Sequence, residues 1–276
     1  MTRIAHLTDL HFGAEDPPVV AGLLAELNAD PPDLIAISGD LTMGARRREF
    51  GAARAFLDAL VAPWLAVPGN HDISPYRLWQ RFTDPYRRWR QFVGPRTEPD
   101  WRDDTVAVFG LNTAHRAGWH WDWSRGSVTR TRLHSLLARM RATPPALARV
   151  VVAHHPLLPP LDAPGTPVAG GATAALRALG DAGVNLVLAG HLHRGYARLA
   201  FPEEVSPLIL QGATATSVRL RGEPNAYNRV AIGADRRVAV ETRIWNGSGW
   251  TTRAEVARDA DPAATPGPGE HVASIT

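Results

Sequence analysis

Five short segments of this sequence are rich in side chains that bind metal ions. They lie between residues 9 and 193 and read Asp9-Leu10-His11, Gly39-Asp40, Gly69-Asn70-His71-Asp72, His154-His155 and Gly190-His191-Leu192-His193. Carboxylate and amide oxygens combined with imidazole nitrogens suit Mn, Fe, Zn or Ni better than Ca or Cu(I). We therefore expect one metal site that takes its ligands from all five segments.

Each of these segments follows an apolar run that predicts a β-strand. The runs are residues 4–7, 34–38, 64–67, 150–153 and 186–189. Side chains at the carboxyl ends of several buried strands can meet in one crevice of an α/β sheet. The strands therefore explain how segments far apart in the sequence could form a single site.

The order of the segments is D-x-H, GD, GNH(D), H and GHxH, and it resembles the signature of the calcineurin-like metallophosphoesterases. Every position of that signature is filled, and the resemblance covers about residues 1–245. It implies an α/β fold, the four-layer αββα sandwich of two mixed β-sheets flanked by helices. It also implies two divalent or mixed-valence transition-metal ions, with Mn, Fe, Zn and Ni all open.

The same resemblance implies a role for each ligand. Asp40 would bridge the two ions, since each carboxylate oxygen can bind one of them. The ligand sets would be Asp9, His11, Asp40 and His193 for one ion, and Asp40, Asn70, His154 and His191 for the other. A hydroxide that bridges both ions would attack phosphorus in line, because two cations stabilise it at neutral pH.

Three polar residues adjoin the ligands in the sequence. In the family, the histidine at the position of His71 faces the substrate and protonates or stabilises the leaving oxygen, and the ordinary pKa of imidazole suits this role. A purely structural role is the alternative. Asp72 is expected to orient His71 or a neighbouring loop, and His155 to support or border the site without binding metal.

Two further segments are candidates for contact with the substrate. The indoles of Trp119, Trp121 and Trp123 could share one face of an extended segment and receive a nucleobase or another apolar leaving group, or they could pack in a hairpin. Residues 211–225 resemble a segment often seen in bacterial cyclic-nucleotide phosphodiesterases. Arg219 or Arg221 would there hold the substrate, or form a structural salt bridge.

Within the family, the chain most resembles the bacterial class III cyclic-nucleotide phosphodiesterases. We therefore expect a metal-dependent phosphodiesterase for cyclic nucleotides or other phosphodiesters. Met43 departs from the acidic residue that many of those enzymes carry in the pattern GDLxD, so a broader enzyme for aryl or nucleotide diesters is an alternative. A phosphomonoesterase or phosphoprotein phosphatase would use the same metal core. A non-catalytic scaffold would be expected to lack ligands or the catalytic histidine, and none is missing.

Composition and charge limit the classes of protein and of partner that fit the sequence. Of the 276 residues, 45% are hydrophobic, which is enough for a substantial core, and the absence of Cys excludes disulfides and thiolate metal sites. All 30 basic residues are Arg, but they are scattered and predict no nucleic-acid groove. The sequence shows neither a secretory signal nor an apolar run of membrane-spanning length. We expect a cytoplasmic enzyme with a small-molecule phosphodiester substrate and no membrane partner, and a homodimer is compatible with the sequence.

A single metallophosphoesterase domain is expected over residues 1–256, with its metal motifs within 9–193 and a strand-rich completion over 196–250. Alternating strands and helices followed by a run of strands favour two packed sheets with helices outside. Apolar spacing predicts helices over residues 19–27, 45–60, 75–92 (interrupted at Pro85), 128–141 and 172–182. Residues 257–276, rich in Ala, Pro and Gly, are expected to form a flexible tail.

Overall fold

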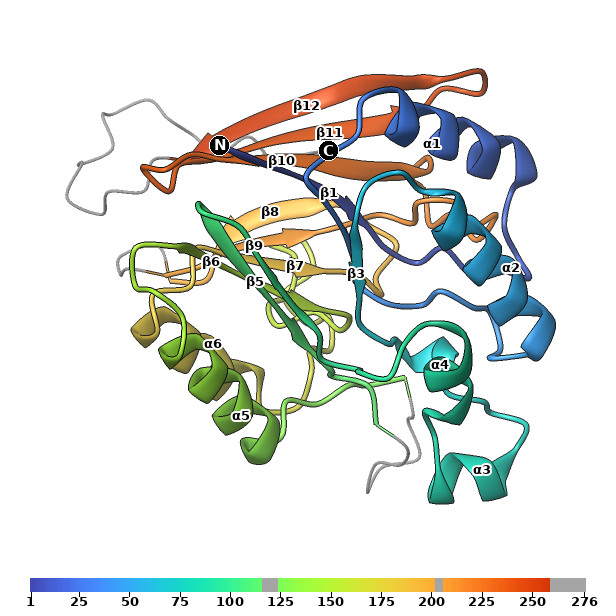
Figure 1. Cartoon of the computed structure of the whole chain (residues 1–276), viewed down its shortest axis with the longest axis horizontal. Coiled ribbons are helices and arrows are strands. Elements are labelled where there is room, and N and C mark those ends of the chain that lie inside the picture. The colour runs from blue at the N-terminus through green and yellow to red at the C-terminus, as the bar shows by residue number, and fades with distance from the viewer. Residues whose placement is uncertain (116–123, 202–205, 259–276) are drawn as a thin grey trace.

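The computed structural model describes residues 1–115, 124–201 and 206–258, which form two six-stranded β-sheets (Figure 1). The first sheet has the strand order β12-β11-β10-β1-β2-β3. Its strands are β1 (Thr2–Leu7), β2 (Leu34–Ile37), β3 (Trp64–Ala66), β10 (Ala226–Ile232), β11 (Val238–Trp245) and β12 (Trp250–Arg258). Strands β1, β2 and β3 run parallel, and β10 to β12 add an antiparallel half.

The second sheet is also mixed and has the order β4-β5-β6-β7-β9-β8. Its strands are β4 (Asp100–Arg102), β5 (Val106–Leu111), β6 (Ala148–Ala153), β7 (Leu186–Ala189), β8 (Tyr196–Leu199) and β9 (Leu208–Gln211). The four central strands are parallel, and β4 and β8 close the two edges in the antiparallel sense. The carboxyl ends of β5, β6, β7 and β9 therefore lie at the same end of this sheet.

Helices cover the outer face of each sheet (Figure 1). Helices α1 (Pro17–Ala29) and α2 (Arg47–Ala59) pack on the first sheet, and α5 (Arg130–Arg141) and α6 (Ala172–Asp181) pack on the second. Three short helices follow β3, namely η1 (Asn70–Asp72), α3 (Leu78–Thr83) and α4 (Arg87–Phe92).

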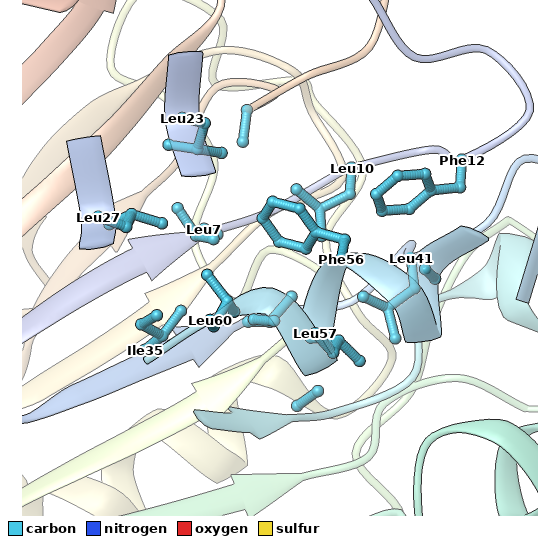
Figure 2. Packing of buried hydrophobic residues seen from close by; sticks show 14 of the residues in the cluster. Leu7, Leu10, Phe12, Leu23, Leu27, Ile35, Leu41, Phe56, Leu57 and Leu60 are labelled. Carbon is cyan, nitrogen blue, oxygen red and sulfur yellow. The ribbon is translucent and has the colours of Figure 1, made fainter. Parts of the chain in front are cut away.

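Apolar side chains fill the space between the two sheets. Ile4 and Leu34 of the first sheet belong to the same buried cluster as Val108, Val150 and Leu188 of the second. A separate cluster joins the first sheet to its helices. In Figure 2 its labelled members from β1, β2, α1 and α2 are Leu7, Ile35, Leu23, Leu27, Phe56 and Leu57, and Leu60 follows the end of α2. The expected four-layer αββα sandwich is therefore confirmed.

Some boundaries differ from those expected from the sequence. Helix α2 begins at Arg47, two residues after the predicted start, because the Glu49 carboxylate accepts hydrogen bonds from the backbone N–H groups of Gly44 at 2.8 Å and Arg46 at 3.1 Å. In such a capping box, the carboxylate of the third helical residue accepts from the backbone N–H of the residue that precedes the helix. Strand β4 was not expected, because only its pairing with β5 makes it a strand.

The C-terminal strands extend further than expected. Strand β12 pairs with β11 along its whole length and ends at Arg258, opposite Val238. The sheet therefore includes two residues assigned to the tail on sequence grounds, and the expected strand-rich region continues beyond residue 250. Residues 259–276 lie outside the described part of the chain. Within residues 1–115, 124–201 and 206–258, no helix combines the length and the apolar character needed to cross a membrane.

Candidate metal centre

The seven expected ligands come together because each follows the carboxyl end of a strand. Asp9 and His11 follow β1, Asp40 follows β2, and Asn70 lies in η1 after β3. From the other sheet, His154 follows β6, and His191 and His193 follow β7. The two sheets face one another, so these strand ends open onto the same crevice.

Five of these ligands have left-handed backbone conformations. Their φ angles are 53° at Asp9, 51° at His11, 53° at Asp40, 77° at His191 and 56° at His193. Residues with side chains seldom adopt such angles, and those that do cluster at functional sites. The turns are held by neighbouring backbone, since Asp9 N–H donates to Gly39 O at 3.1 Å and His11 N–H donates to Asp40 O at 2.9 Å. Each strained turn aims its side chain at the crevice.

One cluster consists of Asp9, His11 and His193, all buried. The Nε2 atoms of the two histidines are 3.1 Å apart, and they lie 3.6 Å and 3.2 Å from Asp9 Oδ1. His193 Nδ1 donates to Arg219 O at 2.8 Å and His11 Nδ1 to Thr42 O at 3.4 Å. Each neutral ring therefore carries its proton on Nδ1 and a lone pair on Nε2.

This arrangement fits a cation. Two lone pairs and a carboxylate oxygen converge, and Asp9 Oδ1 is buried without a hydrogen-bond partner among the described residues. Such a group costs free energy unless something satisfies it. A metal ion would satisfy all three atoms at once, and the hydrogen bonds at the two Nδ1 atoms are the kind that orient histidine ligands.

The second cluster is built around Asp40. His154 Nε2 lies 3.3 Å from Asp40 Oδ2 and 3.1 Å from Asn70 Oδ1, and His191 Nδ1 lies 3.1 Å from the same Asn70 oxygen. His154 Nδ1 donates to Ser38 O at 2.8 Å, which again leaves Nε2 as the ligand atom. Asp40 Oδ2 is also 3.8 Å from His11 Nε2 in the first cluster. Asp40 therefore lies between the two clusters, where a bridging ligand is expected.

The charges of the site also suit cations. Burial works against the charge of Asp9, but the neighbouring imidazoles of His11, His193 and His154 outweigh it and hold its pKa well below the usual range. The pKa of Asp40 is lowered in the same way, by His154 against the effect of burial. Burial lowers the pKa of His154, yet Asp40 raises it to about 9. Both carboxylates are therefore ionised at neutral pH.

Asp72 holds the loops together, and within the described residues its carboxylate makes no hydrogen bond with the His71 ring. Its carboxylate accepts hydrogen bonds from the Thr42 N–H at 2.9 Å, the Thr42 hydroxyl at 3.0 Å and the Gly69 N–H at 2.9 Å. Burial and the charge of Asp40 raise the pKa of Asp72 to about 6. Of the two expected roles, the structure supports the orientation of a neighbouring loop.

His71 lies beside the clusters. Its ring is perpendicular to that of His11, with 4.9 Å between the ring centroids. The backbone N–H of His71 donates to Asp40 Oδ1 at 2.8 Å, and its Nδ1 donates to Met43 O at 2.6 Å. The ring is therefore fixed by Nδ1, and Nε2 remains available.

A cavity of about 400 Å³ opens beside the clusters and is lined by Asp40, Asn70, His71, His191 and His193. Arg219 and Arg221, predicted substrate contacts, also line it, and neither forms an ion pair with a described carboxylate. His155, which was expected to support or border the site, lines it too. Two further lining features, Arg125 and residues 166–169, carried no recognisable pattern in the sequence. Trp119, Trp121 and Trp123 lie outside the described residues.

Comparison with known proteins agrees with this geometry. Residues 2–195 match the family of calcineurin-like phosphoesterases, and the chain belongs to that family.

Two curated relatives share part of the sequence. One is the glycerophosphodiester phosphodiesterase GpdQ of Enterobacter lignolyticus, 34% identical over 80 residues, with 25% of this chain and 29% of the relative covered. The other is a probable cyclic nucleotide phosphodiesterase of Synechococcus sp., 33% identical over 84 residues, with 27% and 32% covered. The matches thus span less than a third of each relative's length.

A solved structure shares the fold. The purple acid phosphatase from yellow lupin (Lupinus luteus) seeds superposes with a TM-score of 0.70 at 9% sequence identity, covering 94% of this chain and 53% of the phosphatase. At that identity the likeness shows the fold alone.

Proposed function

We propose that this chain is a phosphodiesterase that uses two metal ions to hydrolyse cyclic nucleotides and other small phosphodiesters. The observation that carries the proposal is the position of Asp40, whose Oδ2 lies 3.8 Å from His11 Nε2 in one ligand cluster and 3.3 Å from His154 Nε2 in the other. Two ligand sets that share one carboxylate beside a cavity are suited to a pair of metal ions that act on one phosphoryl group.

The proposed ligands follow from the two clusters. Asp9, His11 and His193 would hold one ion, Asn70, His154 and His191 the other, and Asp40 both. Ions of Mn, Fe, Zn or Ni, divalent or mixed-valence, suit these donors and would supply Lewis acidity and a lowered pKa for the attacking water. The neutral amide of Asn70 limits the negative charge that an approaching phosphate meets.

His71 is proposed to move the proton that the leaving group needs. Its Nδ1 is held by Met43 O at 2.6 Å, so Nε2 is the atom that can carry a proton to the leaving oxygen. A proton delivered by a positioned imidazole contributes about 10²–10⁴-fold to the rate of such reactions.

Preference for diesters is supported by the relatives and by the cavity. Both curated relatives are phosphodiesterases by name. Besides the ligands, the cavity of about 400 Å³ is lined by Arg219, Arg221 and residues 166–169, which leaves room for a second ester group. Trp119, Trp121 and Trp123 are proposed to receive that group when it is flat and apolar.

A phosphomonoesterase is the second candidate. Arg125, Arg219 and Arg221 line the cavity, and guanidinium groups attract the additional charge of a monoester dianion. The metal core is the same for both reactions, so substrate comparison must separate them.

The test is a substrate panel on Mn-loaded protein. The panel contains cyclic nucleotides, bis(p-nitrophenyl) phosphate and p-nitrophenyl phosphate. We expect kcat/KM to be higher for the aryl diester than for the matching monoester, and the activity of Asp40→Ala to be lost along with binding of two metal ions per chain. Higher kcat/KM for the monoester would favour the second candidate. If the Asp40→Ala variant kept two metal ions per chain and its turnover, the proposal that Asp40 is a ligand of both ions would be wrong.

A further inference from the structure

His155 has a buried ring nitrogen that no described group satisfies. The side chain is 1% exposed, and Nε2 has no hydrogen-bond partner among the described residues. An unsatisfied buried nitrogen costs about 1–3 kcal/mol and calls for an explanation. His155 also lines the cavity beside the metal clusters, so a bound molecule is an available partner.

The hydrogen bonds of Thr113 determine where the proton of His155 resides. Thr113 Oγ1 accepts a hydrogen bond from the His155 backbone N–H at 3.1 Å and lies 2.8 Å from His155 Nδ1. Within the described residues, Nδ1 is the one acceptor available to the hydroxyl proton. The hydroxyl therefore donates to Nδ1. A neutral imidazole has one protonated nitrogen, so Nε2 carries the N–H.

One edge of the His155 ring is closely packed. A Cβ added at Gly126 would overlap the Cγ, Nδ1 and Cε1 atoms of His155, so the Gly126 backbone lies directly against that edge. The ring also lies near the proposed metal ligands, with 4.7 Å between the ring centroids of His155 and His154, and 4.8 Å between those of His155 and His191. Nε2–H is therefore a fixed donor near the second cluster.

We propose that His155 is a substrate-binding residue whose Nε2–H donates a hydrogen bond to an oxygen of the bound phosphoester. The inference rests on the proposed function, which places a phosphoryl group at the metal clusters. A protonated Nε2 has no lone pair for a metal ion, so His155 would contribute to anion binding without being a ligand. Its geometry is set through Thr113, which acts as a positioning residue.

The experiment measures binding of inorganic phosphate to Mn-loaded protein by calorimetry, with metal affinity measured in parallel. His155→Phe keeps a flat ring without the donor, and we expect the phosphate Kd to rise about tenfold, the loss typical of a hydrogen bond to a charged group. His155→Gln places an amide N–H near the position of Nε2 and should restore most of the affinity. Metal affinity should be unchanged in both variants.

Two further variants serve as controls. Thr113→Val removes the hydroxyl that fixes the proton and should weaken phosphate binding in the same direction as His155→Phe but by less. It also tests the proposal if His155→Phe fails to fold. His134→Phe makes the same substitution at an exposed histidine of α5 and should leave both affinities unchanged.

Loss of metal from His155→Phe would overturn the proposal and make His155 a metal ligand. Wild-type phosphate affinity in His155→Phe would overturn it too, and reduce His155 to cavity packing. If the Mn-loaded wild-type protein bound no phosphate at all, the proposed function itself would fail, which is a distinguishable result.

Discussion

At the scale of single residues, hydrogen bonds to the second ring nitrogen decide what each histidine can do. In His11, His154 and His193 a backbone carbonyl accepts from Nδ1, so Nε2 presents a lone pair to the crevice. In His155 a hydroxyl donates to Nδ1, so Nε2 presents a proton. Two histidines adjacent in the sequence therefore have opposite capacities, one to bind a cation and the other to bind an anion.

A substitution of His71 should affect proton transfer without affecting metal binding. In His71→Ala we expect turnover to fall by about 10²–10⁴-fold, because general acid help is lost. Metal content should remain that of the wild type, since the ring of His71 belongs to neither proposed ligand set. The loss should be smaller for diesters with good leaving groups, which need less protonation. Steady-state kinetics on a leaving-group series, with His134→Ala as control, measures this, and an equal loss along the series would refute the role.

At the scale of elements, the loops after β1, β2 and β3 act as one unit. Asp72 accepts hydrogen bonds from Thr42 and Gly69, which joins the loop after β2 to the loop after β3. Gly69 also lies directly against Asp40, since a Cβ added at Gly69 would overlap Asp40 Oδ1, N and Cγ. The carboxylate that is proposed to bridge the two ions thus keeps its place because the neighbouring loop has no side chain there.

Gly69→Ala should therefore displace the Asp40 carboxylate. We expect metal affinity to fall at least about tenfold, in the range seen when groups that support metal ligands are altered. The matched control is Gly51→Ala in α2, where an added Cβ meets nothing within 4 Å. Titration of the two variants with Mn²⁺ checks this, and equal affinities would show that the contact is not needed.

At the scale of the whole molecule, a buried polar chain crosses the first sheet beneath the site. His6 Nε2 lies 2.8 Å from Ser38 Oγ, Asn228 Nδ2 lies 3.3 Å from His6 Nδ1, and the Thr242 hydroxyl donates to Asn228 Oδ1 at 3.0 Å. The chain links β1, β10, β11 and the loop after β2. Ser38 O in turn accepts from His154 Nδ1, so the chain ends at a proposed metal ligand.

His6 should make the metal-free protein sensitive to acid. Burial lowers the pKa of His6 to about 3, whereas in an unfolded chain the imidazole takes up its proton near the ordinary pKa of 6.5. The contribution of neutral His6 to the free energy of unfolding is therefore complete above pH 6.5 and is lost as the pH falls toward 3. In His6→Gln, which does not titrate, the free energy of unfolding should fall less steeply between these pH values, by up to about 1.4 kcal/mol per pH unit.

Urea unfolding of metal-free wild-type protein and of His6→Gln, at a series of pH values, measures the two slopes. The other buried titratable groups are common to both proteins, so the difference isolates His6. Parallel slopes would mean that His6 is charged in the folded state or accessible to solvent.

The sequence alone determined the chemistry and the class of fold. Polar residues directly after apolar runs predicted which side chains stand at the carboxyl ends of strands, because a buried strand must end where its chain becomes polar. Alternating strands and helices predicted the layered α/β architecture, and β12, β4 and the start of α2 are among the differences. These signals are local, since they depend on residues a few positions apart.

Only the tertiary structure decided the contacts between distant residues. Thr113 determines the tautomer of His155 from 42 positions away, and Arg125 reaches the cavity through a segment with no pattern of its own. Strand β4 exists because β5 offers it a partner, and Asp72 binds loops rather than the adjacent His71 ring. Such pairings depend on how two sheets and their loops pack, and sequence spacing carries no information about distance across that packing.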